Sequence, residues 1–345
     1  MVNVIDCTIR DGSYATGYQW DNNVLRDIVS TLDKAGIGYI EIGNGTGLGM
    51  YRNNSQAKPD SEYFDNTIPY KGNAKIGAFF IPGTGTKEDL KHFRDAGGDF
   101  VRIGTNCTET EKALEYITYA RELGFFVSAN LMKTYAISAY QMAYKSHDLI
   151  KAGAQCVYVV DSAGCMLPEE VERYFSSMRQ LYEVSLGFHG HNNLMFANAN
   201  SYTAVKSGAD FVDATLMSLG RGAGNAQLEA LVALFQKEGV LDDSIDVTML
   251  TDLSERAIAN VASGIKGMNK RDIVIGLARF HDSYMPLVNK YATQYNIDPD
   301  VLITEVSKIN VVKPSAELFE EVAQRLASGT DTQIFFPKFS HKQYK

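Results

Sequence analysis

The stretch Cys156-Val157-Tyr158-Val159-Val160 is apolar at every position and shows no alternation of polar and apolar residues. A strand of this kind is buried on both faces, which is typical of a parallel sheet covered by helices. Similar β-rich runs recur along the chain, and eight strands are predicted in total. The eight predicted strands are Val2–Ile9, Tyr39–Ile42, Lys75–Phe80, Phe100–Ile103, Phe126–Leu131, Cys156–Val160, Leu186–His191 and Phe211–Met217.

The segments between these strands carry apolar residues at helical spacing, as in Val24, Ile28 and Leu32. Strands that alternate with amphipathic helices predict an α/β fold with a parallel sheet, and eight such units close into a (β/α)₈ TIM barrel. An open, doubly wound sheet is the alternative. A dinucleotide-binding sheet of that type would have a GxGxxG motif after its first strand, and none follows Ile9. The barrel is therefore the preferred prediction.

The strand pattern disappears after Val247, and helical patterns follow. We predict a TIM-barrel catalytic domain over residues 1–248, a helical C-terminal domain over 249–333 and a polar tail over 334–345. The longest irregular segment, Asn44–Asn73, follows the second strand on the side where barrel enzymes place their substrate loops. The C-terminal helices, with a break at Pro286, are expected at Leu250–Val261, Asp272–Tyr284, Leu287–Tyr295, Pro299–Val306 and Ala316–Leu326.

The composition excludes several classes of protein. A net charge of -8 without a basic run argues against nucleic-acid binding, and the longest apolar runs are too short to span a membrane. The N-terminus lacks the pattern of a signal peptide. No CxxC pair occurs, so we expect buried free thiols and a reducing, cytoplasmic location. The four cysteines are Cys7, Cys107, Cys156 and Cys165.

Two imidazoles in the run His189-Gly190-His191 lie at positions i and i+2 of a predicted strand, so both point to the same face. The stretch from Asp6 to Gly12 adds a carboxylate, Asp11, at the end of another apolar strand. Two nitrogen ligands and one oxygen ligand with open positions are typical of a catalytic divalent-metal site. The alternatives are ordinary packing for a single histidine and a simple turn for the Asp11-Gly12 pair.

Other polar residues also end predicted strands, and in a barrel such residues meet on one rim. Arg10 and the pair Asp161-Ser162 belong to this group, as do Asn44 and Arg102. A buried Arg10 needs an anionic partner, and either a structural carboxylate (Asp161 or Glu41) or a substrate would serve. A metal ion beside an arginine suits a 2-oxo acid, which can chelate the ion while the cation stabilises an enolate.

The glycine-rich segment Gly220-Arg221-Gly222-Ala223-Gly224-Asn225 follows the eighth strand. Its backbone N–H groups could hold an anion, and a tight turn is the alternative. The residues leave both interpretations open.

The motifs together make the chain similar to the metal-dependent pyruvate aldolases of the 4-hydroxy-2-oxovalerate aldolase type. That family lies within a wider group of aldolase and isopropylmalate synthase-like TIM-barrel metallolyases. A weaker similarity runs through Ile275–Tyr295. The matching stretches are Thr8–Gly12, Val101–Glu109, Val160–Gly164, Gly187–Leu194 and Gly222–Ala226.

The resemblance implies that Asp11, His189 and His191 bind a divalent ion, commonly Mn²⁺, with Mg²⁺ and Co²⁺ as alternatives. It also implies that Arg10 steadies the pyruvyl enolate and that Ser162 helps to hold the substrate carboxylate, with His189 beside the substrate. The helical C-terminal part would correspond to the segment that docks an acylating aldehyde dehydrogenase. A homo-oligomer is the other partner expected.

The chain departs from the family at two positions. The family follows its Arg-Asp-Gly motif with Ser-His, whose histidine is the proposed base, whereas this chain has Ser13-Tyr14. The family places a tyrosine in the C-terminal part where this chain has His281. One hypothesis is that Tyr14 and His281 preserve an acid/base pair with inverted roles. The alternative is that the exchange is incidental and that the site serves another substrate.

These observations predict a metal-dependent carbon–carbon lyase that cleaves or forms a bond between pyruvate enolate and an aldehyde, with a 4-hydroxy-2-oxo acid as substrate. A Claisen-type condensation of acetyl-CoA with a 2-oxo acid is the first alternative, because it uses the same metal and arginine. The second is a non-catalytic metal-binding barrel subunit. Neither nucleic acid nor membrane is expected as a partner.

Overall fold

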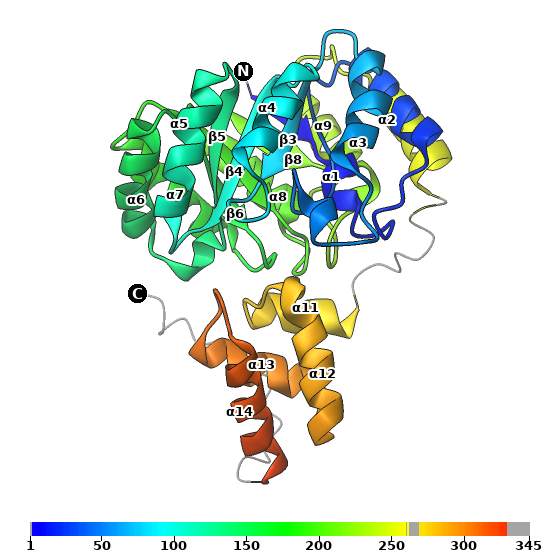
Figure 1. Ribbon diagram of the computed structural model, residues 1–345. Coiled ribbons are helices and arrows are strands. Elements are labelled where there is room, and N and C mark those ends of the chain that lie inside the picture. Colours follow the sequence, from blue (N-terminus) through cyan, green and yellow to red (C-terminus); the bar gives the residue numbers. More distant parts are fainter. Residues whose placement is uncertain (1, 260, 262–268, 330–345) are drawn as a thin grey trace.

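The computed structural model describes residues 2–259, 261 and 269–329. Eight parallel strands form one closed barrel in sequence order, and β8 pairs back to β1 (Figure 1). The predicted (β/α)₈ TIM barrel is therefore confirmed. The strands are β1 (Asn3–Asp6), β2 (Tyr39–Ile42), β3 (Lys75–Phe80), β4 (Phe100–Asn106), β5 (Phe126–Met132), β6 (Cys156–Asp161), β7 (Ser185–Gly190) and β8 (Phe211–Ala214).

Helices cover the outside of the barrel because each buries one apolar face against the strands. In α2, for example, Leu25, Ile28 and Leu32 are fully buried, and the carboxylate of Asp21 caps the helix by accepting from the backbone N–H of Asn23 at 2.7 Å. The barrel helices are α1 (Thr8–Gly12), α2 (Asn22–Lys34), α3 (Asp60–Thr67), α4 (Lys87–Asp95), α5 (Leu114–Glu122), α6 (Ala139–Lys151), α7 (Pro168–Arg179), α8 (Ala197–Lys206), α9 (Leu228–Lys237) and α10 (Val247–Leu253).

Short helical turns complete the barrel. They are the 3₁₀ turns η1 (Met50–Arg52), η2 (Ile68–Tyr70), η3 (Thr110–Ala113), η4 (Thr134–Ala136) and η5 (Leu216–Ser218), and the π turn η6 (Ser254–Ile258).

The barrel interior is layered, because residues two apart on a strand face the same way. An apolar layer fills one level of the interior and includes Phe100, Tyr158 and Phe211. Arg102 lies two residues beyond Phe100 on β4, so its side chain also faces inward, one level closer to the carboxyl ends of the strands. Charged residues therefore form the layer directly beneath the barrel mouth.

Three strands, β1, β7 and β8, end earlier than predicted. β7 ends at Gly190, so His191 lies one residue beyond it and forms an isolated bridge with Asn225. β1 ends at Asp6, because the Asp6 carboxylate accepts from the backbone N–H of Thr8 at 3.1 Å and from its hydroxyl at 2.6 Å, which starts a helical turn. Arg10 and Asp11 consequently lie on α1 rather than on the strand itself. β8 ends at Ala214 instead of Met217, because Met217 takes a positive φ of 50° and donates its N–H to the Glu229 carboxylate at 3.0 Å.

The segment predicted to be irregular, Asn44–Asn73, contains α3 and two 3₁₀ turns, so that prediction was wrong in part. Its first residues do lie at the barrel mouth, because Gly45 and Thr46 line the central cavity. All four cysteines are free and buried, as predicted. Within the part of the chain that the structure describes, no helix is long and apolar enough to cross a membrane.

A helical appendage lies at one end of the barrel (Figure 1) and has a hydrophobic core of its own. Phe319 is fully buried in this core, where its ring lies against those of Phe280, Tyr284 and Tyr291. The appendage helices are α11 (Lys270–Leu277), the 3₁₀ turn η8 (Asp282–Tyr284), α12 (Met285–Tyr295), α13 (Pro299–Ile309) and α14 (Ala316–Ala327).

The predicted single helix Asp272–Tyr284 is wrong. The chain leaves α11 at Leu277, Arg279 takes a positive φ of 54°, and His281 caps the separate turn η8. Pro286 lies in the first turn of α12, where proline is favoured, so it begins a helix instead of breaking one.

The division of the chain after residue 248 stays a prediction. Leu250, Leu253 and Ile258 belong to the barrel's hydrophobic core, whereas the appendage core begins at Val274. These contacts favour a later border than residue 248. The predicted tail, 334–345, lies outside the described residues.

Candidate active site

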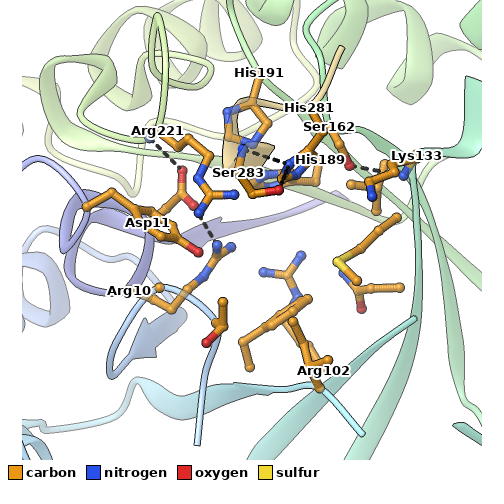
Figure 2. Close-up of a pocket in the computed structure, with 18 of the residues that line it drawn as sticks. Arg10, Asp11, Arg102, Lys133, Ser162, His189, His191, Arg221, His281 and Ser283 are labelled. Atoms are coloured by element: carbon orange, nitrogen blue, oxygen red, sulfur yellow. Dashed lines mark hydrogen bonds and ion pairs between the residues drawn. The ribbon is translucent and has the colours of Figure 1, made fainter. Parts of the chain in front are cut away.

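A cavity of about 210 Å³ opens at the carboxyl ends of the barrel strands, beneath the appendage. Figure 2 shows its lining, in which barrel side chains face His281 and Ser283 of the appendage. The structure therefore brings the residues predicted to bind the metal, bind the substrate or transfer protons together in one cavity, although they are spread over most of the chain. These residues are Arg10, Asp11, Tyr14, Ser162, His189, His191 and His281. Asn44 and Asp161, which were also predicted to lie on this rim, are not part of the cavity lining.

Asp11, His189 and His191 form a compact cluster at the wall of this cavity. One potential ligand atom from each of them lies within 4.8 Å of those of the other two, and all three side chains are buried. A carboxylate oxygen and two imidazole nitrogens suit a divalent cation such as Mn²⁺, Co²⁺ or Mg²⁺. The three residues could therefore hold a divalent metal ion.

The imidazole of His189 is oriented by a carboxylate behind it. Its Nδ1 donates to Oδ2 of Asp213 at 2.8 Å, so Nε2 is the nitrogen left for a metal ion. Burial lowers the pKa of His191 to about 4, although the Asp11 carboxylate opposes the shift. The imidazole of His191 is therefore neutral at physiological pH, which is the form that binds metals.

The carboxylate of Asp11 is held in its ionised form. Burial alone would raise its pKa, but the nearby charge of Arg10, whose Nη1 lies 2.6 Å away, brings the pKa well below its usual value. The other carboxylate oxygen accepts from Nδ2 of Asn225 at 2.6 Å. Oδ1 of Asn225 is buried and has no hydrogen-bond partner among the described residues, which leaves one more oxygen beside the cluster for a cation.

The glycine-rich segment after β8 acts as an anion-binding turn within the chain. The backbone N–H of Arg221 donates to Asp11 at 3.4 Å, and Gly222 and Gly224 have positive φ values of 60° and 85°. The sequence left two interpretations of this segment open, a tight turn and an anion site. The geometry has features of both, because the turn is tight and one of its N–H groups contacts a carboxylate. The anion that it holds is a carboxylate of the protein itself.

A chain of buried charges joins the predicted metal ligands beneath the cavity. Arg10 contacts Glu41 through Nε at 2.7 Å, and Glu41 also lies 3.1 Å from Nη1 of Arg102. Arg102 in turn pairs with Asp213, which holds His189. Each of these charges has an oppositely charged neighbour, which offsets the cost of burying it.

This arrangement decides between the partners that the sequence left open for Arg10. Glu41, not Asp161, is its structural carboxylate. The Asp161 carboxylate instead accepts from the backbone N–H groups of Cys165 at 3.0 Å and Met166 at 2.9 Å. It therefore fixes the turn after β6, and that turn places Ser162 in the cavity wall.

Tyr14 and His281 both reach the cavity, from α1's end and from the appendage respectively. Burial raises the pKa of the Tyr14 hydroxyl, and burial, Arg221 and Lys133 together lower the pKa of His281 well below its usual value. Both side chains are consequently neutral near pH 7. Nδ1 of His281 accepts from the backbone N–H of Ser283 at 3.2 Å and lies 2.7 Å from its hydroxyl, so Nε2 carries the proton.

Sequence reasoning missed several residues that shape this cavity. Asp213 could have been noticed, because it is a charged residue within an apolar strand. Lys133 gave no signal, since it directly follows β5 in an otherwise ordinary stretch. Its backbone N–H donates to Oγ of Ser162 at 3.0 Å, which fixes the one hydroxyl that was predicted to hold a substrate carboxylate.

Comparison with known proteins gives concordant results. The HMGL-like family profile matches residues 1–256. The chain is 33% identical over 328 residues to a 4-hydroxy-2-oxovalerate aldolase of Bacillus cereus, a match that covers 94% of this chain and 96% of that protein. It is 32% identical over 330 residues to 4-hydroxy-2-oxovalerate aldolase 4 of Paraburkholderia xenovorans, with coverages of 94% and 95%.

A solved structure shares the fold at lower sequence similarity. The carboxyl transferase domain of Rhizobium etli pyruvate carboxylase superposes with a TM-score of 0.79 at 16% identity, covering 98% of this chain and 63% of that one. Barrel and appendage therefore occur together in another protein.

Proposed function

The chain belongs to the HMGL-like family, and from that premise we propose that it is a divalent-metal-dependent aldolase that splits a 4-hydroxy-2-oxo acid into pyruvate and an aldehyde, or joins the two. The resemblance to the pyruvate aldolases, inferred from the motifs, is thereby confirmed. The observation that carries the proposal is the cluster of Asp11, His189 and His191 at the mouth of a barrel, with Arg10 in contact with Asp11.

Asp11, His189 and His191 would hold the metal ion, and a bound divalent cation supplies a Lewis acid that stabilises negative charge on the keto oxygen of the 2-oxo acid. The guanidinium of Arg10 lines the same cavity and donates toward the developing enolate oxygen. The Ser162 hydroxyl, fixed by the N–H of Lys133, binds the substrate carboxylate. His189 lies beside the bound acid.

Cleavage needs removal of a proton from the C4 hydroxyl, and condensation needs its return. We assign this exchange to His281 and Tyr14, two uncharged groups that line the cavity outside the cluster of Asp11, His189 and His191 and that can gain or donate a proton. The basic nitrogen of His281 is Nδ1, beside the Ser283 hydroxyl. A proton that Nδ1 takes up would therefore pass through the Ser283 hydroxyl.

Membership of the HMGL-like family also supports proposals for the metal, the cellular location and the protein partner. Mn²⁺ is the proposed metal, with Mg²⁺ and Co²⁺ as alternatives, because the ligand set is mixed nitrogen and oxygen. A reducing cytoplasm suits four free thiols. An acylating aldehyde dehydrogenase, or a second copy of this chain, is the proposed protein partner, in keeping with the aldolase assignment.

The test is pyruvate release from a panel of 4-hydroxy-2-oxo acids, coupled to lactate dehydrogenase, with and without added Mn²⁺. We expect metal-dependent release, and we expect His191→Gln to abolish both release and metal retention. His92→Gln, which alters an exposed histidine outside the cavity, is the matched control. Failure of every substrate with metal demonstrably bound would favour acetyl-CoA condensation or a non-catalytic barrel.

A further inference from the structure

The cavity contains more positive charge than its own carboxylates neutralise. Four cationic side chains line it, and two of them, Arg10 and Arg102, are paired with buried carboxylates. The other two are Lys133 and Arg221. Among the described residues, no carboxylate lies within 4.0 Å of either of these two charged groups.

Lys133 is the more buried of the two, at 5% exposure. Its ammonium donates to the carbonyl oxygen of Val312 and lies 3.5 Å from the hydroxyl of Tyr284, both of which are uncharged. Burial lowers the pKa of Lys133 to about 8, with Glu109 opposing the shift, so the group is still mostly charged at pH 7. A buried ammonium without an opposite charge is costly unless a ligand provides one.

Arg221 is half-buried, and its guanidinium stacks on the ring of Tyr14 at 3.9 Å from the ring centre. A cation–π contact orients the guanidinium but leaves its charge unneutralised. The Arg221 charge acts on the carboxylate of Asp282 from beyond ion-pair distance and opposes the rise of its pKa that burial causes. Arginine remains protonated at any physiological pH, so this positive charge is permanent.

The two cations lie on the appendage side of the cavity. Figure 2 shows Arg221 and Lys133 on either side of His281 and Ser283, whereas Arg10 and Arg102 lie toward the opposite wall. Both charges also act on His281, the pKa of which they lower. The unpaired positive charge is therefore centred on the residues that we assign to the aldehyde end of the substrate.

Space for a longer substrate continues outward from this point. A second cavity, of about 540 Å³, shares Tyr14, Arg221 and Ser283 with the first one. A molecule whose 2-oxo acid end lies at Asp11, His189 and His191 would pass Arg221, which lines both cavities, before it reached the outer one. The metal ion, Arg10 and Ser162 already serve the 2-oxo acid end.

We propose that Lys133 and Arg221 bind a second anionic group, a carboxylate or a phosphate, on the aldehyde-derived part of the substrate. This inference rests on the proposed aldolase function and narrows its substrate class to acids that carry a further negative charge beyond C4. Arg221 can offer paired N–H donors to such a group, and Lys133 adds a point charge.

The first test compares acceptor aldehydes in condensation with pyruvate. Glyceraldehyde 3-phosphate is paired with glyceraldehyde, and succinic semialdehyde with butanal. We expect kcat/KM to favour the charged member of at least one pair by about tenfold or more, and the preferred pair distinguishes phosphate from carboxylate. Equal use of both members in both pairs would overturn the proposal.

Variants show which residues cause the preference. Arg221→Gln and Lys133→Met should each reduce the ratio of kcat/KM for the charged aldehyde to kcat/KM for its neutral counterpart by about tenfold. Because both aldehydes use the same acid/base pair, this ratio is independent of any effect of the substitutions on His281 or Tyr14. Lys313→Gln, an exposed appendage lysine outside the cavity, is the same-charge control. An increase in the KM of pyruvate with unchanged aldehyde preference would assign these cations to the 2-oxo acid instead.

A binding measurement separates this inference from the proposed function. Calorimetric titration of the metal-free protein with glycerol 3-phosphate or succinate, and with glycerol as the neutral control, needs no turnover. We expect binding of at least one anion that Arg221→Gln weakens, even if no pyruvate aldol reaction were found. Absence of binding of both anions, in a protein that does release pyruvate, would overturn the second anion site and leave the aldolase assignment intact.

Discussion

Oδ2 of Asp213 lies 2.8 Å from Nδ1 of His189, and this contact determines which imidazole nitrogen faces the cavity. Asp213 is itself held by Arg102 within the barrel interior. Burial would raise the pKa of Asp213, but the Arg102 charge lowers it below its usual value, so the carboxylate stays ionised. The predicted metal ligand is thus positioned by a residue from the neighbouring strand.

Replacing Asp213 tests this relationship. Asp213→Asn removes the charge that orients His189, and loss of such a partner typically reduces metal affinity about 10–100-fold. Mn²⁺ titration of the purified variant measures the effect. Asp210→Asn, on the same strand connection but paired with Arg179 at the surface, is the matched control. Equal Mn²⁺ affinity in the two variants would show that Asp213 does not position the ligand.

Glu41 connects Arg10 to Arg102, and both arginines are buried. Glu41→Gln removes their shared negative charge, and breaking a buried ion pair in this way typically costs about 3–5 kcal/mol of unfolding free energy. Urea denaturation gives that quantity. We also expect turnover to fall, because Arg10 loses its anchor. A change smaller than about 1 kcal/mol, the size typical of surface pairs, would mean that the network is not coupled.

His281 and Ser283 are predicted to act together in proton transfer. His281→Ala should abolish turnover while the metal content is unchanged, because the ring lies outside the metal cluster. Ser283→Ala should reduce kcat by about 10²-fold, the lower end for loss of a positioned proton-transfer group, and should shift its pH profile. Full activity of both variants would assign the exchange to Tyr14 alone.

The position of His281 should depend on the hydrophobic core of the appendage. Phe319 is fully buried among aromatic rings, and a Phe→Ala change at such a site typically costs about 3–5 kcal/mol. We expect Phe319→Ala to melt the appendage at a lower temperature than the barrel, giving two calorimetric transitions. Turnover should fall while Mn²⁺ affinity stays unchanged. Loss of metal binding as well would show that the barrel site depends on the appendage.

The charge of Lys133 gives a pH dependence. Burial lowers its pKa to about 8, so the ammonium is present below that pH and is lost as the pH rises through it. The preference for a charged aldehyde over its neutral counterpart should therefore decline between about pH 7 and about pH 9.5, while the constant charge of Arg221 retains part of it. In Lys133→Met the preference should be smaller and independent of pH. A flat wild-type profile would contradict this assignment.

Lys133 should also make the stability of the protein depend on pH. The aldehyde preference should fall as the pH rises, whereas the free energy of unfolding should increase. Because the folded pKa of Lys133 lies below its unfolded value, the folded protein binds fewer protons between these two pKa values, and stability rises with pH across that range. Comparison of wild type with Lys133→Met by urea denaturation isolates the contribution. The difference in unfolding free energy should change in favour of wild type as the pH rises above about 8.

The sequence alone determined the barrel and predicted the cluster of Asp11, His189 and His191. Apolar strands such as Cys156–Val160 require burial on both faces, and the i, i+2 spacing of His189 and His191 needs only strand geometry to bring them together. The appendage was predicted less well, since the helix expected over Asp272–Tyr284 ends at Leu277. Local helical spacing does not reveal where the chain must turn to place His281.

Only the tertiary structure decided the electrostatics of the site. Arg102 and Asp213 are 111 residues apart, and Lys133 meets the carbonyl of Val312 across 179 residues. No local pattern records which buried charges find a partner, because pairing depends on how distant strands and the appendage are brought into contact. The absence of a carboxylate within 4.0 Å of Lys133 and Arg221, among the described residues, is therefore a property of the folded protein, and it leaves two positive charges for a second anion.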